Sequence, residues 1–165
     1  MRIDRSADAR IAIRGAGPEE AETVMRLMRL AFEEYRGKLY PESGALGESL
    51  EDVRSGIASG GAFLAFVGDA AAGSARYRVF SDHVYGERIG VLPAYRGRGI
   101  SAALTQAIEA SAGARGIAQV QVKVRASIPF NFRLYEKLGY RIVDSETYPI
   151  GTDVQITLAK DLQTT

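Results

Sequence analysis

Residues 88–110, RIGVLPAYRGRGISAALTQAIEA, join an apolar strand-like run to a stretch of helical spacing. The run ends at Pro93, and Arg96-Gly97-Arg98-Gly99 forms the turn between the two. The first N–H groups of a helix have no partner inside it, and its dipole is positive there, so a strand–turn–helix of this kind suits an anion. Glycines let the backbone approach that anion closely. The segment predicts a phosphate or pyrophosphate site; the alternative is a tight turn with solvated arginines.

Two common phosphate-binding motifs match this turn poorly. A P-loop, G-x-x-x-x-G-K-[ST], needs a lysine that is missing after Gly99. A dinucleotide fingerprint, G-x-G-x-x-G/A, is formally matched by Gly97, Gly99 and Ala102. That fingerprint requires an acidic residue at the end of the next strand, where this chain has Lys123-Val124-Arg125.

The rest of the chain predicts a mixed α/β layer. Apolar periodicity and turn residues predict strands at 11–14, 62–67, 74–80, 83–92, 119–124, 140–143 and 154–158, and helices that start near 18, 50, 100 and 129. Strands 83–92 and 119–124 flank a helix, so they form a βαβ unit and should be parallel. The other strands should pair antiparallel. The predicted fold class is α/β (α+β), with a sheet that contains both parallel and antiparallel strands.

Composition limits the classes of function. With 165 residues, we expect one domain over 11–165, preceded by a flexible segment at 1–10. The net charge of +1 gives no support to nucleic acid as a partner. The chain has no cysteine, which excludes a thiolate nucleophile, and only one histidine, His83. A metal site built from cysteine and histidine is therefore not expected. The N-terminus lacks a signal peptide and the apolar run 57–67 is too short to span a membrane, so a cytoplasmic protein is expected.

The turn also matches R/Q-x-x-G-x-G/A over 96–101, and here the sequence resembles the GNAT superfamily of N-acetyltransferases. Ser101 stands where the family usually has glycine or alanine. A second segment, NFRLYEKLGYRIV at 131–143, resembles the family's late helix and following strand. The resemblance implies a mostly antiparallel sheet with a central βαβ unit and helices on both faces. It also implies acetyl-CoA as co-substrate.

The resemblance implies how acetyl-CoA is held. The loop at 96–101 would bind its pyrophosphate, and the preceding strand would splay from its neighbour so that its backbone bonds the pantetheine arm. Gly90 is expected to leave open room beside the acyl group. Many relatives carry an asparagine three residues before Asn131, where this chain has Ile128. The expected cofactor-binding residues are Ile89, Gly90, Val91, Arg96, Gly97, Arg98, Gly99, Ile100, Ser101, Ala102 and Asn131.

Tyr135 and Glu87 are the expected catalytic residues. In the family a tyrosine at the position of Tyr135 is the usual general acid, and a phenol with a pKa of about 10 can supply a proton to a thiolate with a pKa of about 8.5. The alternative is a tyrosine that only packs on the sheet. Strand alternation places His83, Tyr85, Glu87, Ile89 and Val91 on one face, so Glu87 and His83 are candidates for the general base, and Glu87 is preferred. Its alternative is an ion-paired surface glutamate.

The acceptor is expected to be a small-molecule amine. Candidate substrate-binding residues are Tyr35, Tyr40, His83 and Tyr148, although each tyrosine could pack under a loop and His83 could lie in a turn. The positive charge of Lys123 would disfavour binding of a cationic peptide N-terminus. Without cysteine, transfer should be direct. A protein N-terminal or lysine acetyltransferase and a non-catalytic acyl-CoA-binding domain remain as alternatives, and a homodimer is left open.

Overall fold

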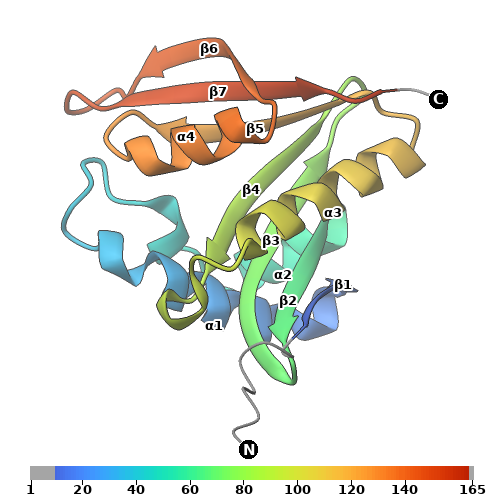
Figure 1. Cartoon of the computed structure of the whole chain (residues 1–165). Coiled ribbons are helices and arrows are strands. Elements are labelled where there is room, and N and C mark those ends of the chain that lie inside the picture. Colours follow the sequence, from blue (N-terminus) through green and yellow to red (C-terminus); the bar gives the residue numbers. More distant parts are fainter. Residues whose placement is uncertain (1–9, 164–165) are drawn as a thin grey trace, which may run out of the picture.

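The computed structural model describes residues 10–163, which form a seven-stranded sheet flanked by helices (Figure 1). The predicted flexible segment 1–10 lies, apart from Arg10, outside the described residues. The strands are β1 (Ile11–Ala16), β2 (Gly61–Val67), β3 (Ala70–Val79), β4 (Val84–Val91), β5 (Gln119–Arg125), β6 (Arg141–Thr147) and β7 (Val154–Asp161). The helices are α1 (Ala21–Phe32), α2 (Leu50–Ser59), α3 (Ile100–Ala114) and α4 (Pro129–Lys137). None of the helices within 10–163 is long and apolar enough to cross a membrane.

The strand order is β1-β2-β3-β4-β5-β7-β6. Every neighbouring pair is antiparallel except β4 and β5, which are parallel and joined through α3. The predicted mixed sheet with a central βαβ unit is therefore confirmed. The predicted elements overlap those observed, and the main differences are later ends of α3, β6 and β7 and an earlier start of β3.

Local sequence signals explain where the helices begin and end. Helix α2 begins with a capping box. The Ser49 hydroxyl accepts a hydrogen bond from the Asp52 N–H, and the Asp52 carboxylate accepts one from the Ser49 N–H. Pro129 occupies the first turn of α4, where its missing N–H has no helical partner to lose. Gly139 follows that helix with a φ of 95°, a left-handed conformation that glycine adopts without a Cβ clash.

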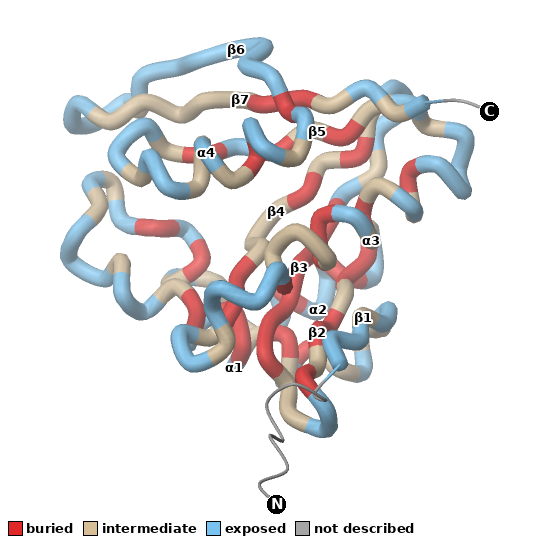
Figure 2. The backbone as a smooth tube through the Cα atoms, in the orientation of Figure 1, coloured by how far each residue is buried: buried red, intermediate tan, exposed pale blue. Residues whose placement is uncertain are grey.

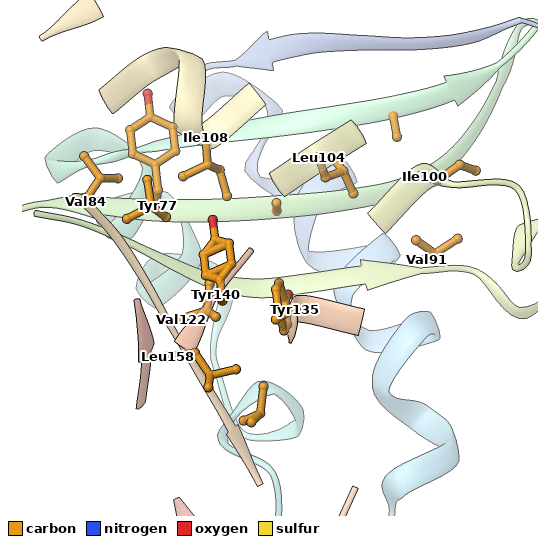
Figure 3. Close-up of a cluster of buried hydrophobic side chains, with 14 of the residues drawn as sticks. Tyr77, Val84, Val91, Ile100, Leu104, Ile108, Val122, Tyr135, Tyr140 and Leu158 are labelled. Carbon is orange, nitrogen blue, oxygen red and sulfur yellow. The ribbon is translucent and has the colours of Figure 1, made fainter. Parts of the chain in front are cut away.

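Two apolar cores lie on opposite faces of the sheet, and most of the buried chain runs through its centre (Figure 2). Strand β2 shows the alternation directly: Ala62 and Leu64 pack with α1 and α2, whereas Ala65 and Val67 pack with α3. The α3 core also contains Tyr135 of α4 and Leu158 of β7 (Figure 3). The predicted helices on both faces are thereby confirmed.

Strands β4 and β5 separate soon after they begin to pair. Only Val84–Gly86 pairs with Val120–Val122. Within the described sheet, the edge of β4 that faces β5 has no strand partner from Glu87 onward. An unpaired strand edge presents free N–H and C=O groups, so this opening provides backbone for a ligand to bond.

A β-bulge interrupts β4 and changes which side chains share a face. The pairing with β3 shifts between Ser74 and Arg76, and Arg88 adopts a φ of 53°. Val84 and Val91 are an odd number of positions apart, yet both belong to the α3 core (Figure 3). The prediction that Tyr85, Glu87, Ile89 and Val91 share a face is therefore wrong, because the extra residue reverses the alternation beyond it.

Candidate functional site

Two adjoining cavities lie where β4 and β5 separate. The first, named the loop cavity, has a volume of about 250 Å³ and is lined by Ala31, residues 89–91, the turn at 95–102 and the start of α4. The second, named the sheet cavity, has a volume of about 330 Å³ and is lined by residues 85–89 of β4, residues 122–125 of β5 and the loop at 41–44. The residues that line both are Phe32, Tyr35, Ile89, Ser101, Asn131 and Leu134.

The loop cavity contains nearly all of the residues predicted to hold acetyl-CoA. Gly97 and Gly99 adopt φ values of 78° and 81°, and a Cβ on either would meet no atom within 4 Å. Gly99 directly precedes α3, whose first N–H groups have no helical partner. Open space, left-handed glycines and a helix start make this turn suited to an anion. Arg98 is the predicted cofactor-binding residue that does not line the loop cavity. It is exposed, and its guanidinium lies over the Tyr95 ring, 5.5 Å from the ring centroid.

Arg96 joins the turn to the end of α1. Its Nη1 forms an ion pair with Glu34 at 2.8 Å, its Nη2 donates to the Ala31 carbonyl at 3.2 Å, and its Nε donates to the Val91 carbonyl at 3.3 Å. These three bonds use all of the guanidinium nitrogens. The side chain therefore positions the end of β4 and the turn against α1, and the backbone of the turn is left to face the cavity.

Gly90 does not leave the open room that the sequence suggested. A Cβ at this position would lie 2.8 Å from the Ala31 Cβ and 3.0 Å from the Phe32 Cε2. The end of α1 fills the space instead. That expectation is wrong because it considered the strand alone, whereas α1 packs across it.

Tyr135 is buried in the α3 core with a relative exposure of 7% and also lines the sheet cavity (Figure 3). Burial raises the pKa of its phenol well above 10, although the interaction with Thr105 acts in the opposite direction. The hydroxyl therefore keeps its proton at every pH at which the protein would work. A protonated phenol in a cavity wall can act as a proton donor.

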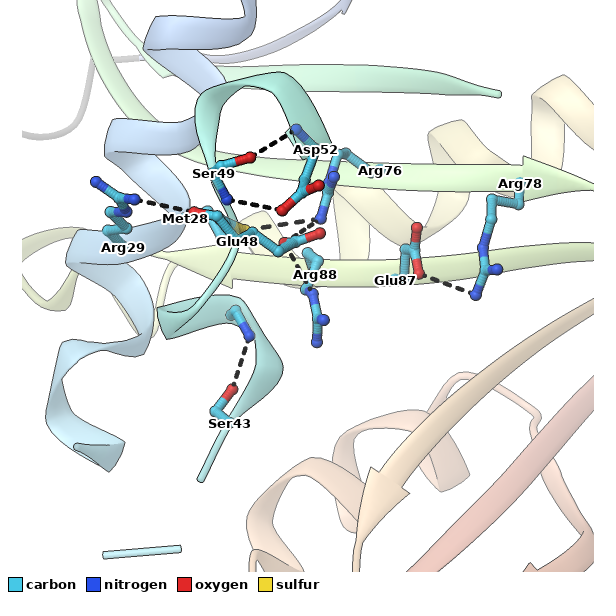
Figure 4. Close-up of polar contacts among 11 residues, drawn as sticks. Met28, Arg29, Ser43, Glu48, Ser49, Asp52, Arg76, Arg78, Glu87 and Arg88 are labelled. Atoms are coloured by element: carbon cyan, nitrogen blue, oxygen red, sulfur yellow. Dashed lines mark hydrogen bonds and ion pairs between the residues drawn. The ribbon is translucent and has the colours of Figure 1, made fainter. Parts of the chain in front are cut away.

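Glu87 also lines the sheet cavity and is ion-paired. Its carboxylate lies 3.2 Å from a guanidinium nitrogen of Arg78 on β3 (Figure 4). Arg78 is half exposed, so this pair is screened by solvent. Both readings of the sequence thus apply to Glu87, since it is paired and it faces the cavity.

The four predicted substrate-binding residues lie in different places. Tyr35 lines both cavities and Tyr148 lines the sheet cavity, where the Arg125 guanidinium lies 4.5 Å from its ring centroid. Tyr40 is 65% exposed and lines a separate surface hollow near Gly151. Among the described residues, His83 lies outside the lining of both cavities; it stacks on Phe80 in the turn before β4.

Sequence reasoning missed Arg88 and Arg125. Arg125 donates to the Pro41 carbonyl at 2.6 Å and so ties β5 to the loop over the sheet cavity. Arg88 lines the same cavity from the bulge. No local signal marks either arginine, because the bulge and the loop contact depend on residues far away in the chain.

Comparison with known proteins agrees with this geometry. The profile described as "Acetyltransferase (GNAT) family" matches residues 23–140. The chain belongs to this family. A curated relative, the acetyltransferase SG1711 of Sodalis glossinidius (strain morsitans), is 42% identical over 57 residues, which cover 34% of this chain and 40% of that protein. The chain thus matches less than half of that relative's length.

Solved GNAT structures share the fold over nearly the whole chain. The PaiA N-acetyltransferase of Thermoplasma acidophilum, in complex with coenzyme A, superposes with a TM-score of 0.76 at 21% identity and covers 92% of this chain and 99% of its own. The ribosomal-protein-S18-alanine N-acetyltransferase of Escherichia coli superposes with a TM-score of 0.77 at 21% identity, with coverages of 94% and 96%. A GNAT acetyltransferase of Elizabethkingia anophelis with acetyl-CoA bound has a TM-score of 0.68 at 19% identity, with coverages of 92% and 98%.

Proposed function

We propose that this protein is an acetyl-CoA-dependent N-acetyltransferase that transfers an acetyl group directly to a primary amine of a small molecule. The observation that carries the proposal is the meeting of the two cavities at the opened edge of β4. The loop cavity offers a turn suited to a pyrophosphate, and the sheet cavity offers a protonated phenol and a carboxylate. Two solved relatives with this fold hold coenzyme A or acetyl-CoA.

The residues of the loop cavity fit the cofactor. Open space above Gly97 and Gly99 leaves the backbone and the first N–H groups of α3 free to bond phosphate oxygens. Ile89, Gly90 and Val91 carry the backbone of the unpaired β4 edge, where a pantetheine amide could add as a strand would. Asn131 of α4 lines both cavities, and its side-chain amide is the proposed partner of the pantetheine arm. Bound acetyl-CoA would supply the activated acetyl thioester.

Tyr135 and Glu87 take the two proton-transfer roles in this proposal. Transfer forms a carbon–nitrogen bond and breaks the carbon–sulfur bond, so the sulfur must gain a proton and the amine must lose one. Burial raises the pKa of the Tyr135 phenol, so it holds its proton at working pH, and in this proposal it passes that proton to the sulfur as the carbon–sulfur bond breaks. Glu87 is the proposed acceptor of the amine proton. A small acceptor is favoured over a cationic peptide because Lys123, Arg88 and Arg125 also line the sheet cavity.

Calorimetric titration with acetyl-CoA, beside NAD and ATP, tests the proposal first, followed by thiol release with a panel of amines. We expect binding of acetyl-CoA alone. Tight binding with no thiol release from any amine would favour an acyl-CoA-binding domain instead. Binding of NAD or ATP in preference to acetyl-CoA would contradict the proposal.

Gly99→Val should raise the dissociation constant of acetyl-CoA at least tenfold, because a branched side chain fills the space assigned to the phosphates. Gly116→Val is the matched control. Gly116 has a φ of 74°, and its Cβ would also meet no atom within 4 Å, but it lies beyond the other end of α3. Both variants carry the same backbone strain. Equal affinities in the two variants would remove the turn from the binding site.

A further inference from the structure

A polar cluster beside the sheet cavity contains two arginines that share one carboxylate. Glu48, in the loop before α2, lies between Arg76 of β3 and Arg88 of β4 (Figure 4). Its carboxylate oxygen Oε2 pairs with the Arg76 Nη2 at 2.5 Å and with the Arg88 Nε at 3.3 Å. One carboxylate therefore serves two guanidinium groups.

Arg88 is the less closely paired of the two arginines. Arg76 is only 3% exposed, and a buried cation needs a close counter-ion, so the shorter of the two contacts of Glu48 belongs to Arg76. Among the described residues, the Arg88 nitrogens Nη1 and Nη2 have no hydrogen-bond partner, and Arg88 lines the sheet cavity. The Nη1–Nη2 end of this guanidinium is thus unbonded and belongs to a residue that lines the sheet cavity.

The backbone conformation of Arg88 is a second, independent observation. Arg88 has a φ of 53°, and it is the one residue other than glycine with a positive φ among the described residues. A left-handed conformation is unfavourable for a long side chain, and such strain is typical of functional sites. The β-bulge in β4 produces this conformation and changes the direction of the Arg88 side chain.

Lys123 is a second cation in the lining of the sheet cavity. Glu87 forms an ion pair with Arg78, and Arg125 is held by two loop carbonyls and by Asp153. Glu42 is exposed and accepts from the Gly37 N–H. Lys123 lies over the Tyr85 ring at 5.4 Å and makes no ion pair with any residue in 10–163. Two cations, Arg88 and Lys123, are therefore available to a ligand.

We propose that the sheet cavity selects acceptor amines that also carry a carboxylate, such as amino acids, with Arg88 binding the carboxylate and Lys123 adding positive charge. A planar guanidinium with two free N–H groups matches the two oxygens of a carboxylate. The proposal rests on the N-acetyltransferase function and names its class of acceptor. It gives a role to the unbonded Nη1 and Nη2 groups of Arg88 in the lining of the sheet cavity.

The test compares amino acids with their carboxamides, which keep the amine and lose the negative charge. The amine panel also contains O-phosphoethanolamine and ethanolamine, and rates are compared per unprotonated amine. Acetyl-CoA affinity is measured first on each protein. The variants are Arg88→Gln, Lys123→Gln and the control Arg54→Gln, which removes an exposed arginine of α2 outside both cavities.

We expect the wild type to prefer acids over carboxamides and Arg88→Gln to lose roughly 10- to 100-fold in kcat/KM for acids only. Lys123→Gln should lose less, and Arg54→Gln should match the wild type. Equal use of acids and carboxamides, or an unchanged preference in Arg88→Gln, would overturn the proposal. Faster acetylation of O-phosphoethanolamine than of any acid would replace the carboxylate with a phosphate and so overturn it as well.

Two outcomes of the experiment distinguish a failure of this proposal from a failure of the proposed function on which it rests. If acetyl-CoA binds but no acid is acetylated, the acceptor class is wrong while the cofactor site stands. If acetyl-CoA does not bind, the proposed function itself fails. Thermal unfolding checks that Arg88→Gln is folded. If it is not, the comparison uses Lys123→Gln and Arg88→Lys, the second of which keeps the charge. An acid preference that Lys123→Gln leaves unchanged would then count against the proposal.

Discussion

At the scale of single residues, two buried tyrosines that touch each other have different surroundings. The rings of Tyr135 and Tyr140 lie edge to face with centroids 5.6 Å apart (Figure 3). The Tyr140 hydroxyl donates to the Glu109 carboxylate at 2.9 Å, and Tyr140 does not line the sheet cavity, whereas Tyr135 does. Burial is shared, so access to the cavity is what distinguishes a candidate proton donor from a structural tyrosine.

Tyr135→Phe should lower kcat by about 100-fold or more, with little change in acetyl-CoA affinity, because it removes the proposed proton donor and keeps the ring. Thiol release and calorimetry measure the two quantities. Because burial raises the pKa of Tyr135, the phenol stays protonated as the pH rises to 10, and the wild-type rate should show no loss from its ionisation below that pH.

Tyr140→Phe provides the matched control. It should leave kcat near the wild-type value and lower the free energy of unfolding by about 1–2 kcal/mol, through loss of the hydrogen bond to Glu109. Urea unfolding measures the stability of both variants. The role of Tyr135 is contradicted if the two variants have similar kcat values.

At the scale of elements, the contact between α1 and β4 sets the shape of the site. Ala31 and Phe32 at the end of the helix cover Gly90, and Arg96 bonds the Ala31 and Val91 carbonyls. Phe32 in turn lines both cavities. A shift of the end of α1 would therefore alter the cofactor side and the acceptor side together.

Gly90→Ala should destabilise the protein by about 1–3 kcal/mol, because the added Cβ would overlap the Ala31 Cβ at 2.8 Å. Gly15→Ala on β1 is the control, since its Cβ would meet no atom within 4 Å. Urea unfolding should show a loss for the first variant and little change for the second. An equally stable Gly90→Ala protein would show that α1 does not pack on the strand in this way.

At the scale of the whole molecule, the sheet is joined across its middle by a short parallel contact. Strands β1–β4 and strands β5, β7 and β6 form two antiparallel groups that meet only at Val84–Gly86 and Val120–Val122. The cavities lie in the remaining opening. A ligand that bonds the free edge of β4 would add contacts where the sheet has few of its own.

Acetyl-CoA at 100 times its dissociation constant should raise the midpoint of thermal unfolding by roughly 5–10 °C. Binding to the folded state at that ratio adds about 2.7 kcal/mol, and each kcal/mol shifts the midpoint of a protein of this size by about 2–4 °C. A thermal scan with and without acetyl-CoA measures the shift, with NAD as the control ligand. A similar shift with NAD, or none with acetyl-CoA, would argue against a specific site in the opening.

The turn at 96–101 and the order of helices and strands could be predicted because they depend on neighbouring residues. Gly97 and Gly99 adopt left-handed backbone, Pro129 starts a helix and Gly139 follows one, all for reasons local to the chain. An ion pair at Glu87 and a turn at His83 were among the alternatives that the sequence offered, but Arg78 as the partner of Glu87 and the separate surface hollow at Tyr40 could not be predicted. They depend on which segments meet in three dimensions.

By itself, the sequence determined the central βαβ unit, the family and the turn suited to an anion, because hydrophobic periodicity and a short Gly-rich motif encode them locally. Tertiary structure alone decided that α1 fills the room above Gly90 and that Arg88 faces the sheet cavity. The physical reason is the same in both cases. A β-bulge and a packed helix arise from contacts between residues far apart in the chain, and a single extra residue in β4 reverses every side chain beyond it.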